Sequence, residues 1–244
     1  MDTSTFVGPG GRPVTALTAE EMRAVDRVAV ETVGLDLPRM MEHAGRGLAE
    51  TVLDHQIDGS ITVLAGNGGN GGGGLACARH LANRDHPVRV ILDRDPTEID
   101  GVTADQLRIL EAMDVPIEAP DDVPGIDLDA PLDGVIVDAL IGYGLTGAPR
   151  GAAAELIETV DDATGPVVSL DVPSGTNATT GKTPGAAVDP DVTATLALPK
   201  TGLAAVDGGL LLVDLSIPPT VYDRLDIEHG RPFGNGFAVQ LSRA

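Results

Sequence analysis

The chain has 244 residues, 42% of them hydrophobic, which is enough apolar material to bury the core of one large domain. Its formal net charge of −21, with Lys182 and Lys200 as the two lysines, excludes nucleic acid and anionic membranes as electrostatic partners. Carboxylate-rich surfaces are typical of proteins that work at very high salt, where screening removes self-repulsion. No apolar run is long enough to cross a bilayer, and the N-terminus lacks the basic flank of a signal peptide. We therefore expect a halophilic, cytoplasmic protein.

The N-terminal region predicts an arm followed by two helices. Residues 1–13 are rich in Gly and Pro, so we expect a disordered arm there and a single domain over residues 14–244. Thr18, with Glu21 three residues later, forms the pattern of a capping box that begins the first helix. A second helix is expected to begin near Pro38.

Beyond the second helix, strands alternate with helices. Apolar strands separated by helices indicate a parallel sheet that is covered on both faces, an α/β fold. The single cysteine, Cys77, lies in a helical stretch where a small apolar residue packs well, and we interpret it as part of the core. The strands are expected at 61–65, 87–92, 115–117, 134–139, 167–172, 192–198 and 210–215, and the helices at 75–83, 104–113 and 152–160.

A glycine-rich stretch over residues 66–74 joins the first strand to the following helix. The arrangement of strand, glycine loop and helix directs backbone N–H groups and a helix N-terminus toward one point, and that point attracts phosphate. Glycine also lets the backbone approach a ligand without a Cβ in the way. The stretch therefore predicts a nucleotide site, although a flexible loop is the simpler alternative.

Two further loops follow strands of the predicted sheet. Asp138 ends one strand and precedes Gly142 and Gly144, and Asp171 ends the next and precedes Pro173. An aspartate at the end of a strand can simply cap a turn. Two of them beside loops at the carboxyl edge of a parallel sheet favour a ligand site.

The glycine stretch also matches the dinucleotide fingerprint of dehydrogenases. Gly66, Gly68 and Gly71 have the required spacing, and Asp93 follows at the end of the next strand, where it would bind ribose hydroxyls. In that fingerprint the helix begins almost at once, whereas here glycine continues to Gly74 and is expected to delay the helix. An NAD(P)-dependent dehydrogenase stays an alternative.

Several motifs in the same order resemble the YjeF N-terminal domain family, the NAD(P)H-hydrate epimerases. The resemblance extends over residues 17–200. It rests on residues 17–22, 41–46, the glycine stretch with residues 78–81, residues 137–140 with 142–144, residues 171–175 and residues 198–200.

The resemblance implies a Rossmann-like three-layer α/β/α fold, a homodimer, and interconversion of the R and S forms of hydrated NADH and NADPH in nicotinamide nucleotide repair. It implies Asp171 as the catalytic acid and base, with Lys200 as a partner or as a solvated lysine at a strand end. It implies a potassium ion at Asn70, Asp138 and Ser174, whose oxygens suit a hard cation. Because the chain ends at Ala244, the dehydratase that accompanies the epimerase is expected to be a separate protein. The substrate-binding residues implied are Gly69, Asn70, Gly71, Gly72, Gly73, Gly142, Tyr143, Gly144, Leu145, Thr146, Gly147, Ala148 and Asp171.

This sequence departs from the family pattern at three positions. Gly69 and Gly73 stand where the family has Asn and Asp, and His43 stands where it has Asn. Loss of the Asp is expected to remove a polar contact from the nucleotide site, while the backbone donors stay. A non-catalytic nucleotide-binding module of the same fold is therefore a second alternative.

Overall fold

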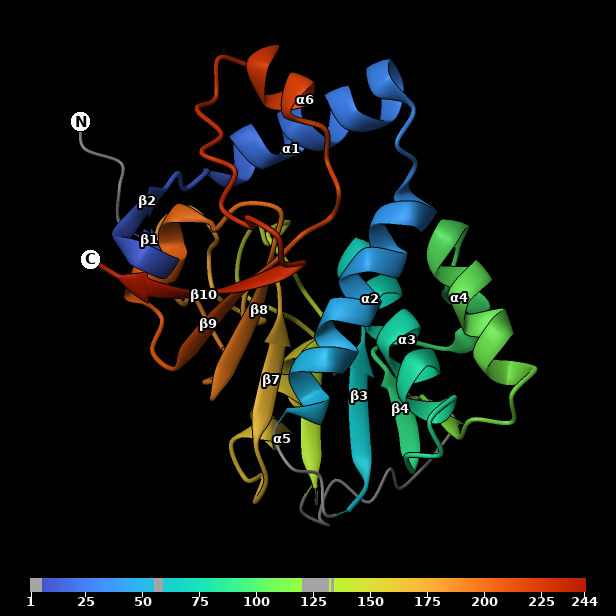
Figure 1. The fold of residues 1–244 in the computed structure, drawn as a ribbon. Helices are drawn as coiled ribbons and strands as arrows, with labels where there is room; N and C mark the ends of the chain where they lie inside the picture. The colour runs from blue at the N-terminus through green and yellow to red at the C-terminus, as the bar shows by residue number, and fades with distance from the viewer. Residues whose placement is uncertain (1–5, 55–58, 120–131, 133) are drawn as a thin grey trace.

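The computed structural model describes residues 6–54, 59–119, 132 and 134–244, and its centre is a ten-stranded sheet (Figure 1). The strand order is β2-β1-β10-β9-β8-β7-β6-β3-β4-β5. All pairings from β9 to β5 are parallel, while β10, β1 and β2 extend the sheet with antiparallel pairings. The strands are β1 (Phe6–Gly8), β2 (Arg12–Val14), β3 (Ile61–Ala65), β4 (Val88–Leu92), β5 (Ile117–Glu118), β6 (Val135–Ala139), β7 (Val167–Leu170), β8 (Val192–Leu196), β9 (Gly209–Val213) and β10 (Ala238–Arg243).

Helices cover both faces of this sheet, which confirms the three-layer α/β/α architecture. In Figure 1, α2, α3 and α4 lie on one face, and the apolar side of α5 packs against β3 and β6 from the other. None of the helices in the described part of the chain is long and apolar enough to span a membrane. The helices are α1 (Ala19–Arg27), α2 (Leu37–Leu53), α3 (Gly69–Ala82), α4 (Gly101–Glu111), α5 (Ala152–Val160) and α6 (Pro219–Asp223).

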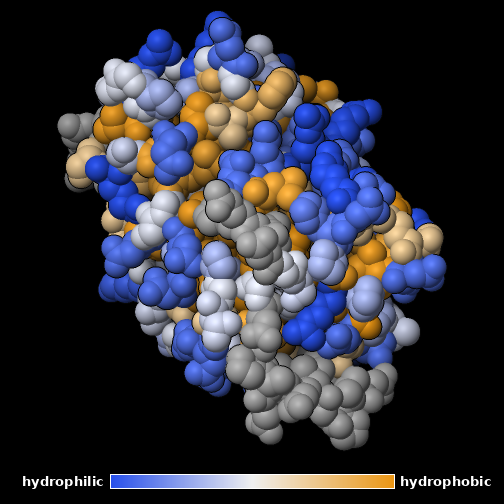
Figure 2. Space-filling view, turned by 60° about the horizontal axis from the view of Figure 1, so that its bottom comes forward, coloured by the Kyte–Doolittle hydropathy of each residue, from blue (hydrophilic) through white to orange (hydrophobic). Residues whose placement is uncertain are grey.

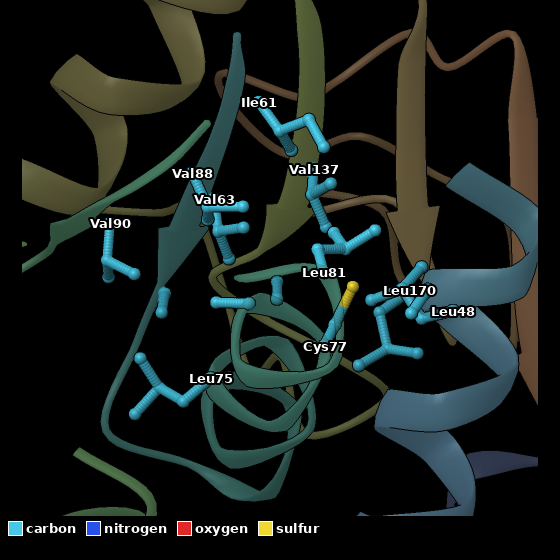
Figure 3. Packing of buried hydrophobic residues seen from close by; sticks show 14 of the residues in the cluster. Leu48, Ile61, Val63, Leu75, Cys77, Leu81, Val88, Val90, Val137 and Leu170 are labelled. Atoms are coloured by element: carbon cyan, nitrogen blue, oxygen red, sulfur yellow. The ribbon is translucent and has the colours of Figure 1, made fainter. Parts of the chain in front are cut away.

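An apolar cluster lies between the sheet and the pair α2 and α3 (Figure 3). Leu48 of α2 and Leu81 of α3 meet Val63 and Leu170 of the sheet there, and all four are fully buried. Cys77 lies among them, and burial raises the pKa of its thiol. The prediction that this cysteine belongs to the core is confirmed.

The helices α2 and α3 are also joined by a charged cluster at their surface. Glu42 of α2 accepts a hydrogen bond from the Arg79 guanidinium and pairs with His80 Nε2 at 2.9 Å. Burial lowers the pKa of His80. Burial alone would raise the pKa of Glu42, but the hydrogen bond and charge of Arg79, with a smaller effect of His80, outweigh it and hold this pKa below the usual range. His43, one position after Glu42, is exposed.

The expected disordered arm was wrong from Phe6 onward, and residues 1–5 lie outside the described residues. Phe6 is fully buried and β1 pairs with β10 on one side and β2 on the other. Gly10, at φ +74°, helps the chain to turn between β1 and β2. The glycines and prolines that suggested disorder therefore build a hairpin, whose partner strand β10 lies at the far end of the sequence.

The capping box at the start of α1 is confirmed. The Glu21 amide donates to Thr18 Oγ1 at 3.2 Å, and the Thr18 amide donates to Glu21 Oε2 at 2.7 Å. A π-helical segment, Val28–Val33, continues α1 and ends at Gly34, whose φ of +81° terminates the turn. This run of helix lies beyond the carboxyl ends of the strands (Figure 1).

The sheet brings three predicted loops to one place. β3, β6 and β7 are neighbours, with Ala65 opposite Ala139 and Asp138 opposite Ser169. The direction of strand succession reverses between β3 and β6, and ligands bind at such switch points in parallel sheets. The glycine stretch, the Asp138 loop and the Asp171 loop therefore open at the same edge.

Candidate active site

A cleft of about 530 Å³ lies at this edge of the sheet, a size that suits a small-molecule ligand. The ends of β3, β6 and β7 supply one side, and α1 and the start of α2 supply the other. Of the predicted site residues, those that line it are Gly69, Asn70, Gly142, Tyr143, Gly144 and Asp171.

The glycine stretch is the first part of the site, and its structure differs from the prediction. We expected glycine to delay the helix, but α3 begins at Gly69. A Cβ on Gly71 would lie 1.6 Å from the Gly66 carbonyl oxygen, so only glycine allows this tight turn from β3 into the helix. The first backbone N–H groups of a helix have no partner within it, and the first residues of α3, Gly69 and Asn70, line the cleft, where an anion would satisfy such groups.

The other glycines of this stretch serve packing, so their predicted contact with the substrate is not supported by the lining of the cleft. Gly71, Gly72 and Gly73 are buried inside α3. A Cβ on Gly73 would meet Leu170 Cδ2 at 2.8 Å and Ala44 Cβ at 3.7 Å. The position of Gly73, where the family pattern has an aspartate, therefore lies against the sheet. Glycine at this position lets α3 approach β7 closely.

The second part of the site is a buried carboxylate at the end of β6. Asp138 is fully buried, and its oxygens accept hydrogen bonds from Ser169 Oγ at 2.7 Å and from the Ser174 amide at 2.9 Å. The Ser174 hydroxyl also donates to it, and the Leu140 amide does so at 3.3 Å. Burial raises the pKa of Asp138, and the hydrogen bonds from these neutral donors offset only part of this effect.

These residues fit a monovalent cation. Asp138 has no cationic side chain among its described hydrogen-bond partners. The amide of Asn70 lies against Gly142, since a Cβ there would meet its Oδ1 at 3.0 Å. A carboxylate, an amide oxygen and a hydroxyl are ligands that hard cations prefer.

The third part of the site is an ion pair between Asp171 and Lys200, whose side chains are 4% and 1% exposed. Lys200 Nζ donates to Asp171 Oδ1 and, at 2.8 Å, to the Leu196 carbonyl oxygen. The interpretation of Lys200 as a solvated lysine was wrong. Asp171 has a φ of +67°, which ends β7 at Leu170 and explains why this strand is shorter than the sequence predicted.

The loop after β6 completes this wall of the cleft. The Tyr143 amide donates to Asp171 Oδ2 at 3.4 Å, and the Tyr143 hydroxyl donates to Asp26 of α1. The rest of this loop points elsewhere: Leu145 is half-buried, Thr146, Gly147 and Ala148 are exposed, and none of the four lines the cleft.

Sequence analysis missed the residues that α1 and α2 contribute. Arg23 and Asp26 of α1 line the cleft, and the Arg23 guanidinium lies 5.7 Å from the centre of the Tyr143 ring, a cation–π distance. Met40 and Met41 of α2 add an apolar wall. The helical stripe of α1 was visible in the sequence, but nothing in it indicated that Asp26, beside the stripe, faces a ligand site.

The position of Asp93 in the structure does not support the dehydrogenase alternative. Its two carboxylate oxygens accept hydrogen bonds from Arg94 at 2.8 and 3.0 Å, and Asp93 does not line the cleft. A ribose-binding carboxylate has to offer its oxygens to the ligand. Because α3 begins at Gly69, the expected delay of this helix no longer speaks against a dehydrogenase. The pairing of Asp93 with Arg94 speaks against it instead.

A mostly parallel sheet with helices on both faces, and with a cleft, a buried carboxylate and a buried Asp–Lys pair at the carboxyl ends of its strands, is a Rossmann-like architecture. Residues 38–202 match the family model described as YjeF-related protein N-terminus, and the chain belongs to this family.

Individual relatives agree with this assignment. The chain is 45% identical to an NAD(P)H-hydrate epimerase of Dehalogenimonas lykanthroporepellens, over 97% of each chain. It is 40% identical to a bifunctional NAD(P)H-hydrate repair enzyme of Hyperthermus butylicus, over 86% of this chain and 40% of that protein. The crystal structure of a yeast protein superimposes with a TM-score of 0.80 at 24% identity, over 95% of this chain and all of that one, and shows the same fold.

Proposed function

We propose that this protein is an isomerase that interconverts the R and S forms of hydrated NADH and NADPH. The observation that carries the proposal is the buried Asp171–Lys200 pair beside the open N-terminus of α3. The identity to a named epimerase over nearly the whole of both chains supports it.

The cleft can hold a dinucleotide by its charge and shape. The free N–H groups at Gly69 and Asn70 suit a phosphate group. The apolar wall of Met40 and Met41 suits a ring. A nucleotide whose phosphates lie at the start of α3 would extend its nicotinamide ring toward Asp171.

The reaction requires a hydroxyl group to leave a ring carbon that is bonded to nitrogen. The nitrogen lone pair assists this departure, and water then returns to the other face of the flat iminium. Asp171 is suited to transfer the protons, because a carboxyl group can first give and then take one. Lys200 balances its charge and, through the Leu196 carbonyl oxygen, fixes its position.

A potassium ion at Asn70, Asp138 and Ser174 belongs to this proposal. When bound, the ion would supply positive charge next to the buried Asp138 and bring the β3, β6 and β7 loops together. This organising role fits a weakly charged cation better than strong Lewis acid catalysis.

The net charge of −21 supports the proposal that this protein is halophilic and works in a cytoplasm with a high salt concentration. The protein should lose stability as salt is removed, because its negative charges then repel one another more strongly. On the face shown in Figure 2, hydrophilic side chains are interspersed with apolar ones. A homodimer completes the proposal. Sedimentation at high potassium chloride tests the dimer.

An epimerisation assay at high potassium chloride with separated R and S hydrates tests the function. The protein should accelerate the approach of both isomers to equilibrium, and Asp171→Asn should abolish the acceleration. Asp105→Asn, the same change at an exposed carboxylate on α4, is the matched control and should behave as the parent. A parent no faster than buffer that still binds the hydrates would instead make the chain a non-catalytic nucleotide-binding module.

A further inference from the structure

A second carboxyl group lies in the cleft, and the proposed mechanism does not yet use it. Asp26 of α1 lines the same cleft as Asp171 of the sheet. Tyr143 connects them, since its amide donates to Asp171 Oδ2 and its hydroxyl donates to Asp26 Oδ2. One carboxyl group is therefore hydrogen-bonded to the backbone of this tyrosine and the other to its hydroxyl.

The surroundings of Asp26 suit proton transfer more than they suit a structural contact. Burial raises the pKa of Asp26, and the hydrogen bond from Tyr143 offsets only part of this effect. Burial, together with the charge of Asp26, also raises the pKa of Tyr143, so the phenol keeps its proton. A phenol that donates to a carboxyl group has an oxygen with enhanced basicity and can still accept a hydrogen bond from a ligand in the cleft.

The proposed reaction benefits from two proton-transfer groups. Inversion at a flat iminium requires water to leave one face of the ring and return to the other. A single carboxyl group would have to reach both faces, whereas two groups on opposite walls can each serve one. Two carboxyl groups that hold a substrate atom and a water between them act in this way in inverting glycosidases.

We propose that the Tyr143 hydroxyl, held by Asp26, is a second catalytic group of the epimerase, serving the face of the nicotinamide ring opposite to the face that Asp171 serves. This inference rests on the proposed function. Tyr143 is the group that meets the substrate, and Asp26 is a positioning residue that supplies and receives the proton through it.

The protons and bonds balance over the two half-reactions. In the first, Asp171 gives a proton to the leaving hydroxyl, the C–O bond breaks, and water departs from the iminium. In the second, water forms a new C–O bond on the other face and gives a proton to the Tyr143 oxygen, while the Tyr143 hydroxyl passes its own proton to the Asp26 carboxylate along the hydrogen bond between them. The cycle leaves Asp171 ionised and Asp26 protonated, a state that is ready for the reverse direction or is reset by proton exchange with solvent.

A double-mutant cycle on the full chain tests this inference. Asp26→Asn keeps the size of the side chain and an acceptor for Tyr143, and Tyr143→Phe keeps the ring beneath Arg23. Each single variant should lower kcat by about 10²–10⁴-fold, with KM within about threefold of the parent value. Because the two residues act as one unit, the kcat of the double variant should be no more than about threefold below the kcat of the poorer single variant. Asp105→Asn is the control for the Asp-to-Asn change.

Several results would overturn the inference. These are a kcat of Asp26→Asn or Tyr143→Phe within threefold of the parent, losses that appear in KM alone, or losses that multiply in the double variant. Tyr143→Phe keeps the test valid if Asp26→Asn fails to fold, which thermal unfolding would show. A parent without epimerase activity refutes the proposed function and this inference together, whereas an active parent with active variants refutes this inference alone.

Discussion

Breaking the buried ion pair by Lys200→Met should destabilise the protein strongly. The Asp171 and Lys200 side chains are 4% and 1% exposed, so the loss of the ammonium leaves a largely buried carboxylate without its counter-charge. Removing one partner of a buried pair costs about 3–5 kcal/mol of unfolding free energy, because the remaining charge is uncompensated. The Leu196 carbonyl oxygen also loses its 2.8 Å hydrogen bond.

Urea unfolding at one fixed, high potassium chloride concentration measures this loss without a change in surface repulsion. The double variant Asp171→Asn with Lys200→Met is the internal control, since it removes both charges. Asn also tolerates the left-handed backbone at φ +67°, so the double variant should recover at least about half of the loss. The reasoning is refuted if Lys200→Met alone stays within about 1 kcal/mol of the parent.

Four further outcomes are expected. Asp171→Asn lowers kcat by about 10²–10⁴-fold in the epimerisation assay while unhydrated NADPH still binds in calorimetry. Gly71→Ala lowers the unfolding free energy by at least about 3 kcal/mol in urea, because its Cβ would lie 1.6 Å from a backbone oxygen, whereas Gly69→Ala, in open space, changes it by less than about 1 kcal/mol. Burial lowers the pKa of His80 in the folded state, so the unfolded state binds more protons as the pH falls from about 7.5 to about 5.5. Stability decreases over that window, and His80→Gln reduces the decrease. Replacing potassium by lithium at equal ionic strength lowers stability by on the order of 2–3 kcal/mol in the parent and leaves Asp138→Asn unchanged.

Each of these expectations has a clear contrary result. Normal turnover of Asp171→Asn would assign the proton transfer to another group. Equal stabilities of Gly71→Ala and Gly69→Ala would mean that the turn after β3 tolerates a side chain. An unchanged pH slope in His80→Gln, with exposed His43→Gln as control, would place the titration elsewhere. Equal stability in potassium and lithium would remove the cation from the site.

The parallel part of the fold was predictable because its signals are local. Each inner strand is an apolar run, and the carboxyl ends of neighbouring parallel strands share one edge, so Asp138 and Asp171 were placed together from the sequence. The antiparallel extension was not predictable in this way. β1 pairs with β10 across almost the whole length of the chain, and its short strands lie within a segment whose glycines and prolines also suit disorder.

The glycine stretch shows where propensity misleads. Glycine is a poor helix former, and this predicted a start of α3 at residue 75. In the structure the helix begins at Gly69, because close packing requires a residue without a Cβ at Gly71 against Gly66 and at Gly74 against Ala139. The gain from close contact between α3 and the sheet outweighs the conformational cost of glycine, and no local signal records that gain.

The opposite wall of the site could not be found from local patterns, because the contacts that build it join distant positions. Tyr143 and Asp26 are separated by 117 residues. In the sequence Asp26 is one charged residue beside the apolar stripe of α1, and charged residues beside such a stripe normally face solvent. It becomes a cleft residue only because α1 lies over the carboxyl ends of the strands, where its polar flank meets the loop that follows Asp138 (Figure 1). A ligand in the cleft would therefore contact both the sheet edge and α1, and the hydrogen bond from Tyr143 to Asp26 links these two walls.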